Sequence, residues 1–244
     1  MRKANKYVSV LVVVALYFLI RIKQSPSLPS IITIVETGIK ILGSEKFYVN
    51  VAYTMKIVWI GIGISFFCGS ILAILCSANN LIYSAVMPII NATKNVPSIA
   101  LFPVFIVLMG IGDLPRVFVI IWNSAYPIIT TMLRAIYDVE KEVIEAAQNA
   151  GATKWQMYRY IKLPLSLVRV LEGLKISVSN GFIAIVVAEM LGATKGLGYM
   201  IVWSTNAFKY PDMYVYIFAI AFIGFAINII IEKIIRRIER RLYS

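Results

Sequence analysis

Six apolar stretches, separated by short polar segments, dominate the pattern along the chain. A helix needs about 20 mostly apolar residues to cross a bilayer, so stretches near that length predict membrane spans. The predicted spans are Tyr7 to Ile20, Ile57 to Cys76, Ile99 to Gly112, Arg116 to Tyr137, Leu167 to Leu191 and Met213 to Ile235. Six helices nearly fill 244 residues. The pattern therefore predicts an all-α, polytopic membrane protein with one transmembrane domain over residues 1–244.

The first apolar stretch resembles a secretory signal in one respect, because basic residues precede it. It has no small-residue cleavage site, however, and Arg21 and Lys23 follow it at once. These features favour a retained helix over a removed signal peptide.

Residues 138–164, between the fourth and fifth predicted spans, break the apolar pattern. Asp138 is placed to cap a helix with a narrow face of small residues, including Val143, Ala147 and Ala150. A face of this kind lets another surface approach the backbone closely. Gly151 follows where a left-handed residue commonly ends a helix.

A second short helix is predicted directly after this glycine. Thr153 and Gln156 have the spacing of a capping box for a helix from Lys154 to about Lys162. Pro164 is suited to open the span that follows. Residues 138–164 are therefore predicted to form a polar helical hairpin at the membrane surface.

Charge orients the predicted spans. Hydrophobic residues make up 60% of the chain, the mean hydropathy is +0.81, and the net charge is +12. Basic residues gather in the hairpin and in the segment from Lys233 to Arg241, and such clusters are typical of cytoplasmic segments. We therefore expect both termini in the cytoplasm and contacts with anionic lipid. Nucleic-acid binding would need a basic aqueous face, and we expect none.

Residue types that are absent from the sequence exclude several chemistries. The chain has no histidine, which excludes His-based metal sites and proton relays. Cys68 and Cys76 lie eight residues apart in one predicted helix, about 12 Å along its axis, too far for a disulfide. No phosphate-binding glycine loop is present, so ATP hydrolysis is not expected. No metal or other cofactor is therefore expected on this chain.

The hairpin carries a specific motif. Glu145-Ala146-Ala147 is followed by three residues and Gly151, then by nine residues and Ile161-Lys162-Leu163-Pro164. This spacing resembles the cytoplasmic coupling loop of ABC importer permeases. The resemblance implies a type I ABC importer fold, in which Glu145, Ala146, Ala147, Gly151, Ile161, Leu163 and Pro164 contact the ATPase.

Other segments are similar to the nitrate, sulfonate, taurine and bicarbonate group of these permeases. They are an amphipathic stretch from Ile31 to Leu42 after Leu28-Pro29-Ser30, the run from Pro97 to Asp113, and Ala188-Glu189-Met190 with Gly196-Leu197-Gly198-Tyr199. The chain departs from the group at Leu108-Met109 and at Asn95, where an aromatic and a basic residue are common. The departures leave the cargo open.

The resemblance also implies partners. Two copies of this chain would form the pore, two ABC ATPase subunits would bind ATP and Mg²⁺, and an extracytoplasmic solute-binding protein would deliver cargo. The expected location is the inner or plasma membrane of a prokaryote. The expected cargo is a small oxyanion or organosulfonate, with a vitamin precursor or another organic nutrient as the alternative.

Polar residues inside the predicted spans are candidates for the translocation path, because they are costly in lipid and tend to face the bundle interior. The candidates are Asn123, Ser124, Ser177 and Asn180. Hydrogen bonding between helices is an equally good explanation. Glu189 could pair with a base across a closed gate or reach the membrane interface, and the segment from Gly196 to Asp212 could dock a solute-binding protein or form an aromatic belt.

Two other classes of function fit the sequence less well. A channel or secondary transporter would not need the Glu-Ala-Ala hairpin. An intramembrane enzyme would need a catalytic constellation, and the predicted spans contain neither an acidic pair nor a Ser-Lys dyad.

Overall fold

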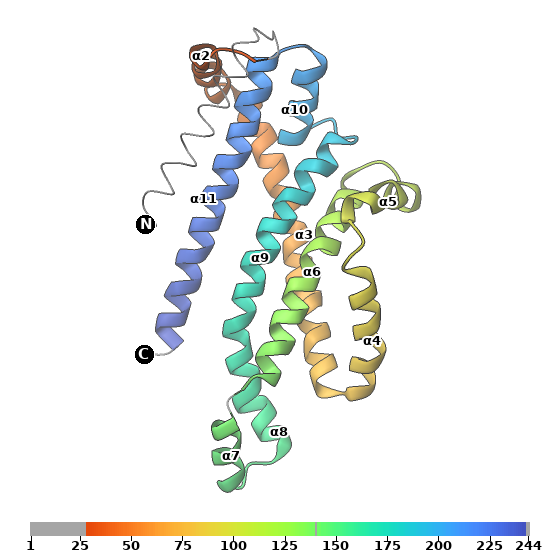
Figure 1. The fold of residues 1–244 in the computed structure, drawn as a ribbon, viewed down its shortest axis with the longest axis vertical. Helices are drawn as coiled ribbons and strands as arrows, with labels where there is room; N and C mark the ends of the chain where they lie inside the picture. Colours follow the sequence, from red (N-terminus) through yellow and green to blue (C-terminus); the bar gives the residue numbers. More distant parts are fainter. Residues whose placement is uncertain (1–27, 140, 243–244) are drawn as a thin grey trace, which may run out of the picture.

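The computed structural model describes residues 28–139 and 141–242, and this part of the chain consists of helices and turns without a strand. Three long helices form the centre of the bundle (Figure 1): α3 (Glu45–Ala78), α6 (Asp113–Tyr137) and α9 (Leu163–Met190). On either side of them lie α4 (Asn80–Thr93) and α11 (Tyr210–Leu242). The predicted all-α class is confirmed.

The central helices approach closely where one of them carries a glycine. A Cβ at Gly61 of α3 would lie 2.6 Å from Cγ2 of Ile120 in α6, and one at Gly173 of α9 would lie 2.0 Å from Oγ1 of Thr131. Small residues at such crossings let membrane helices gain van der Waals contact over their backbones. The α3–α6–α9 core is therefore held by tight packing at specific positions.

Four described helices are long and apolar enough to cross a membrane: Glu45–Ala78, Asp113–Tyr137, Val170–Met190 and Tyr210–Ile238. They correspond to the second, fourth, fifth and sixth predicted spans. The first predicted span, Tyr7 to Ile20, lies outside the described residues. The count of six spans therefore stays a prediction.

The third predicted span, Ile99 to Gly112, is wrong as a single helix. A 3₁₀ turn, η1 (Ser98–Leu101), leads into the short helix α5 (Phe102–Met109). These pass as one span only together with α4, from which they bend by 92°. Pro97 has no N–H to continue α4 and disfavours helical geometry at Val96, and Gly110, at φ +81°, ends α5.

Two shorter helices lie at the end of the bundle opposite the hairpin (Figure 1): α2 (Ile31–Leu42) and α10 (Leu197–Asn206). The predicted stretch from Ile31 to Leu42 is confirmed as α2. The Ser30 side chain accepts a hydrogen bond from the Thr33 N–H at 3.1 Å and so caps this helix.

Candidate functional site

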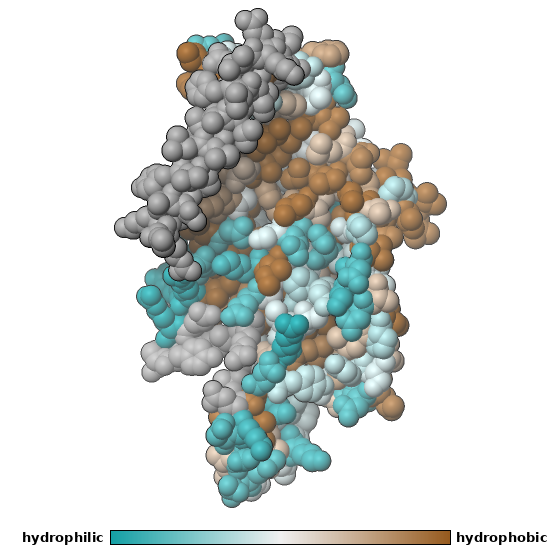
Figure 2. Space-filling model, in the orientation of Figure 1, coloured by the Kyte–Doolittle hydropathy of each residue, from teal (hydrophilic) through white to brown (hydrophobic). Residues whose placement is uncertain are grey.

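The hairpin extends beyond the bundle at its lower end (Figure 1). Its first arm is α7 (Lys141–Asn149), and its second arm is α8 (Lys154–Met157) followed by a π-helical turn, η2 (Tyr158–Lys162). Hydrophilic side chains gather over this end in Figure 2, whereas hydrophobic ones cover the region around α5. No residue of α7 is buried. The first arm of the hairpin is therefore exposed to water or to a partner.

The turn between the two arms is set by backbone hydrogen bonds at Gly151. The N–H of Ala152 donates to Ala147 O and that of Gly151 to Gln148 O, both at 2.9 Å. This pair of bonds is a Schellman motif, and it places Gly151 at φ +80°. A Cβ at Gly151 would have no heavy atom within 4 Å. A larger residue here would thus strain the left-handed backbone and would project toward any bound partner, but it would not clash with the rest of the chain.

The second arm runs without a break into a membrane-spanning helix. The Thr153 side chain accepts from the Gln156 N–H at 3.3 Å, and the Gln156 side chain accepts from the Thr153 N–H at 2.8 Å, so the predicted capping box is confirmed. Helix α8 continues through η2 into α9, and Pro164 stands at the first turn of α9. The second arm and α9 therefore form one continuous helical segment.

The motif residues of the first arm face outward. Glu145 and Ala146 are exposed and Ala147 is half-buried. The ion pair that the structure gives Glu145 is with Lys141, at 3.5 Å, and both side chains are mostly in solvent. Exposed pairs of this kind contribute little to stability. The structure thus leaves the Glu145 carboxylate accessible to a partner.

The sequence analysis did not single out the aromatic residues of the second arm. Trp155 and Tyr160 are 67% and 73% exposed, although large aromatic side chains are usually covered. The Tyr158 ring is stacked on the Trp155 ring, with the two ring centroids 6.1 Å apart. The Tyr158 hydroxyl also makes a hydrogen bond of 2.7 Å to the Ser77 hydroxyl of α3. The sequence feature that could have predicted this stacking is the Trp155–Tyr158 spacing of three residues, which places both rings on one helical face.

A hollow of about 310 Å³ lies where the two arms meet. It is lined by Ala150, Gly151, Ala152, Gln156, Tyr160 and Ile161. Two motif residues, Gly151 and Ile161, therefore share one concave surface with an exposed aromatic ring, which is a shape that can receive a protruding side chain of another protein.

Two of the four candidates for the translocation path are buried between helices. Ser124 of α6 donates to Ser177 O at 3.0 Å, and Ser177 of α9 donates to Ser124 O at 2.6 Å. Both serines have no exposed surface. This reciprocal pair matches the helix-to-helix hydrogen bonding that was the alternative explanation for them.

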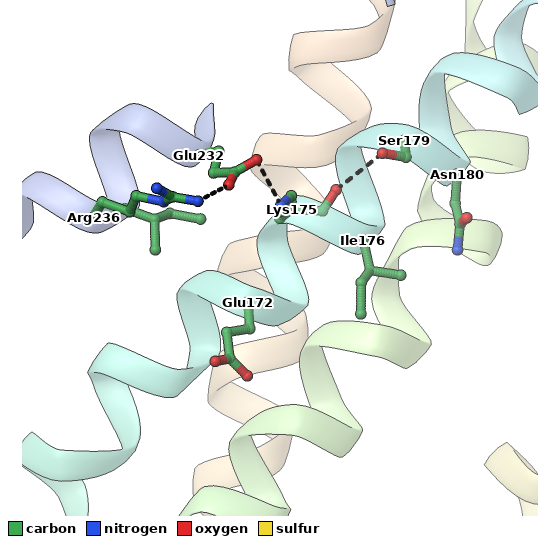
Figure 3. Close-up of a pocket in the computed structure, with 8 residues that line it drawn as sticks. Glu172, Lys175, Ile176, Ser179, Asn180, Glu232 and Arg236 are labelled. Atoms are coloured by element: carbon green, nitrogen blue, oxygen red, sulfur yellow. Dashed lines mark hydrogen bonds and ion pairs between the residues drawn. The ribbon is translucent and has the colours of Figure 1, made fainter. Parts of the chain in front are cut away.

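The other two candidates are only partly buried. Asn123 donates to the Asn180 carbonyl oxygen at 3.1 Å. Asn180 also lines a cavity of about 570 Å³ between α9 and α11. Figure 3 shows Lys175 of α9 facing Glu232 of α11, whose carboxylate also accepts a hydrogen bond from Arg236. The Lys175–Glu232 pair, at 3.1 Å, fastens the lower part of α11 to α9.

Glu189 lies inside the protein at the opposite end of α9. Its side chain is 1% exposed, so the predicted alternative that it reaches the membrane interface is wrong. It accepts hydrogen bonds from the Thr54 hydroxyl at 2.8 Å and from the Gly198 N–H, in the first turn of α10, at 2.9 Å. A Cβ at Gly196 would lie 2.3 Å from this carboxylate. Its hydrogen-bond donors in the described chain are neutral groups of α3 and α10, and the positive charge of Arg116 in α6 is near enough to act on the carboxylate.

A second group of polar contacts surrounds the same loop. Arg116 of α6 is buried and donates to Gly192 O at 2.7 Å, to Tyr53 at 3.1 Å and to Asp113 at 3.2 Å. Asn50 accepts from the Gly196 N–H at 2.7 Å. These bonds hold the loop between α9 and α10 against both α3 and α6.

Beyond this loop, the end of the bundle opposite the hairpin carries aromatic and basic side chains. Lys46 and Lys209 lie over the Trp203 ring at 4.4 and 5.1 Å from its centroid. Phe208 is 77% exposed and has a left-handed backbone, with φ 56°. An exposed phenylalanine with a left-handed backbone, next to Lys209 in the sequence, is suited to contact with another protein.

Comparison with known proteins identifies the chain. The model of the family described as binding-protein-dependent transport system inner membrane component matches residues 61–243. The chain belongs to this family. It is accordingly a multi-pass membrane permease, a transport subunit of the ABC importer type, and its resemblance to the taurine and sulfonate group is confirmed.

Two relatives illustrate the range of named cargo. The chain is 31% identical to the formylaminopyrimidine transport permease protein of Halalkalibacterium halodurans over 83% of this chain and 81% of that one. It is 33% identical to the taurine transport system permease protein of Escherichia coli, over 64% of this chain and 55% of that one.

Solved structures show the same fold. An inward-facing form of the MetNI methionine ABC transporter matches with a TM-score of 0.67 and 20% identity, over 80% of this chain and 98% of that one. A bacterial alginate ABC transporter matches with a TM-score of 0.59 and 16% identity, over 99% of this chain and 96% of that one. The type I ABC importer fold is thereby confirmed.

Proposed function

We propose that two copies of this permease form the pore of an importer that two separate ABC ATPase subunits drive. The ATPase subunits bind ATP and Mg²⁺, and this chain binds neither. An extracytoplasmic solute-binding protein delivers the cargo. The observation that carries the proposal is the hairpin: an exposed, small-residue surface with a Schellman turn at Gly151, continuous with α9.

The coupling step follows from this continuity. When the ATPases close, they move the two hairpins, and each hairpin moves its α9. The pore then exchanges inward-facing and outward-facing states, and hydrolysis reverses the exchange. The shift that the ATPases impose on this equilibrium is no larger than the difference in docking free energy of the hairpins in the two states.

The orientation proposed is hairpin and both termini in the cytoplasm. It rests on the basic residues of the hairpin and of the end of α11. The outer surface around Trp203 and Phe208 then receives the solute-binding protein, and the two lysines over Trp203 suit an acidic patch on that protein.

Labelling of single cysteines tests this orientation. In a background without Cys68 and Cys76, a cysteine at Thr194 should react with an impermeant thiol reagent added to intact cells. A cysteine at Gln148 should react only after the membrane is opened, although both positions are exposed. Reaction at position 148 in intact cells would refute the orientation.

For cargo we propose a small oxyanion or organosulfonate, in keeping with the permease group that the chain resembles. The match to a formylaminopyrimidine permease supports a vitamin precursor as the second candidate.

Gly151→Asp tests the coupling proposal. Left-handed strain and a new carboxylate at the docking surface should abolish cargo-stimulated ATP hydrolysis and uptake, while the protein still inserts in the membrane. Gly151→Asn is the matched control, because asparagine tolerates a left-handed backbone better and adds a similar volume without charge. Wild-type uptake by a normally inserted Gly151→Asp protein would show that the turn is not the coupling hinge.

A further inference from the structure

A cavity of about 380 Å³ between α4, α5 and α6 is separate from the hairpin and from the charged cavity beside α11. Four aromatic side chains line it, Phe105 from α5 and Phe118, Trp122 and Tyr126 from α6, and Lys94 stands at the end of α4. Among the described residues around it, Lys94 carries the one charge.

The Lys94 ammonium lies level with the middle of α6, a helix long and apolar enough to cross a membrane. Its Nζ donates to the Tyr126 hydroxyl at 3.2 Å. Tyr126 is 13 residues from the first residue of α6 and 11 from the last, which places it about 20 and 16 Å from the two ends of that helix. A lysine at this depth is expensive in lipid, so it is expected to face protein or a water-filled space.

The break between α4 and α5 supplies that space. The two helical pieces are bent by 92° relative to each other. Lys94 is the C-cap of α4, and residues 95–97 after it are not helical. Irregular backbone at membrane depth is tolerated where it lines a cavity. Lys94, which is exposed in the described chain, therefore stands beside an irregular segment that interrupts this span.

The described protein does not neutralise this lysine. Its partners are neutral acceptors, Asn91 Oδ1 at 3.2 Å and the Tyr126 hydroxyl. No carboxylate of the described chain pairs with it, in contrast to Lys175, which faces Glu232. An ammonium group that no carboxylate neutralises favours an anion beside it.

The aromatic side chains give the cavity an apolar wall. The rings of Phe105 and Trp122 lie with centroids 6.3 Å apart, and those of Phe105 and Phe118 6.0 Å apart. Inorganic anions such as sulfate gain nothing from such a wall. A flat or apolar organic body gains both contact area and ring stacking.

We propose that this cavity is a transit site for a small organic anion, with its acidic group on Lys94 and its apolar or aromatic body against Trp122 and Phe105. The proposal rests on the proposed import function and narrows its cargo class from oxyanions in general to organic ones.

Binding of naphthalenesulfonate to the whole 244-residue chain in phosphatidylcholine nanodiscs tests this site, for example by microscale thermophoresis. Naphthalenesulfonate should bind saturably, with sulfate and the neutral naphthalenemethanol at least about tenfold weaker. Lys94→Gln should weaken naphthalenesulfonate binding by roughly tenfold to a hundredfold, the range of one charge-assisted hydrogen bond, and Lys94→Arg should keep most of it. Trp122→Leu should weaken it too.

Lys40→Gln is the matched control, because Lys40 is an exposed lysine of α2 that does not line the cavity. It should bind like the wild type. Absence of saturable binding, equal binding by Lys94→Gln, or equal affinity for sulfate would overturn the site. So would displacement of naphthalenesulfonate by phosphatidylglycerol, which would assign Lys94 to a lipid headgroup.

The assay uses neither ATP nor an ATPase. Failure of the Gly151 test therefore leaves this result unaffected, and loss of binding here leaves the coupling proposal standing.

Discussion

The two ends of α9 are built in opposite ways. At the hairpin end, the arm that leads into α9 carries exposed aromatic residues, and the neighbouring α7 buries no residue. At the other end, Glu189 is 1% exposed and accepts hydrogen bonds from Thr54 and from the first turn of α10. Helix α9 thus joins a surface whose side chains make few contacts within the protein to a cluster whose polar groups are buried and hydrogen-bonded.

We interpret this difference as one between a surface proposed for coupling and a cluster that stabilises the fold. A docking surface needs groups whose bonds are not already satisfied inside the protein, and Glu145 and the hollow at Gly151 meet that condition. A buried carboxylate with several donors stabilises one arrangement of α3, α9 and α10. Mutations at the two ends should therefore have different readouts, coupling at one and stability at the other.

Glu189→Ala should have the largest effect, and it should fall on stability. The change leaves the Thr54 hydroxyl and the Gly198 N–H buried without an acceptor, which costs about 3 kcal/mol in the free energy of unfolding. Thermal unfolding in detergent measures it, and Glu189→Gln, which keeps one acceptor, should recover part of the loss. Unchanged melting combined with lost uptake would make Glu189 a gate residue rather than a structural one.

Glu145→Ala should have the next largest effect, and it should fall on coupling. We expect stimulated ATP hydrolysis and uptake to fall together by an amount equivalent to one charge-assisted hydrogen bond, about 1.5–3 kcal/mol. Cargo binding by the isolated solute-binding protein and the melting temperature should not change. A variant with full stimulated hydrolysis and full uptake would show that Glu145 is only a solvated part of α7.

Ser177, which lies between the two ends of α9, should give a smaller effect when it is replaced by alanine (Ser177→Ala). The change removes the bond to Ser124 O, and such interhelical bonds in membranes contribute about 0.5–1 kcal/mol. Melting should fall slightly and cargo selectivity should stay the same. A change in selectivity without a change in melting would place Ser177 on the translocation path.

Lys141→Ala should have the smallest effect. Its pair with Glu145 is exposed, and such pairs on one helix contribute about 0.2–0.5 kcal/mol. Stimulated hydrolysis should stay near the wild-type rate. If it falls as far as in Glu145→Ala, the function of Glu145 is to pair with Lys141 within α7 and not to meet a partner.

The sequence by itself determined what depends on local spacing. Hydropathy located the described spanning helices, and the Thr153–Gln156 spacing predicted the capping box. The left-handed backbone at Gly151 was predicted from its place after a helix. Each of these features follows from interactions within a few residues, which is why a single sequence is enough to predict them.

Only the tertiary structure decided which distant groups meet. Glu189 lies 135 residues from Thr54, and no local pattern shows that these two side chains bond. The broken span was predicted only as Ile99 to Gly112, and α4 was not predicted, because neither stretch alone is as long as a full span and the bend of 92° that joins them is a tertiary feature. The cavity at Lys94 depends on that break. Burial and pairing across the bundle are set by how whole helices pack, and residues far apart in sequence have no spacing from which that packing can be predicted.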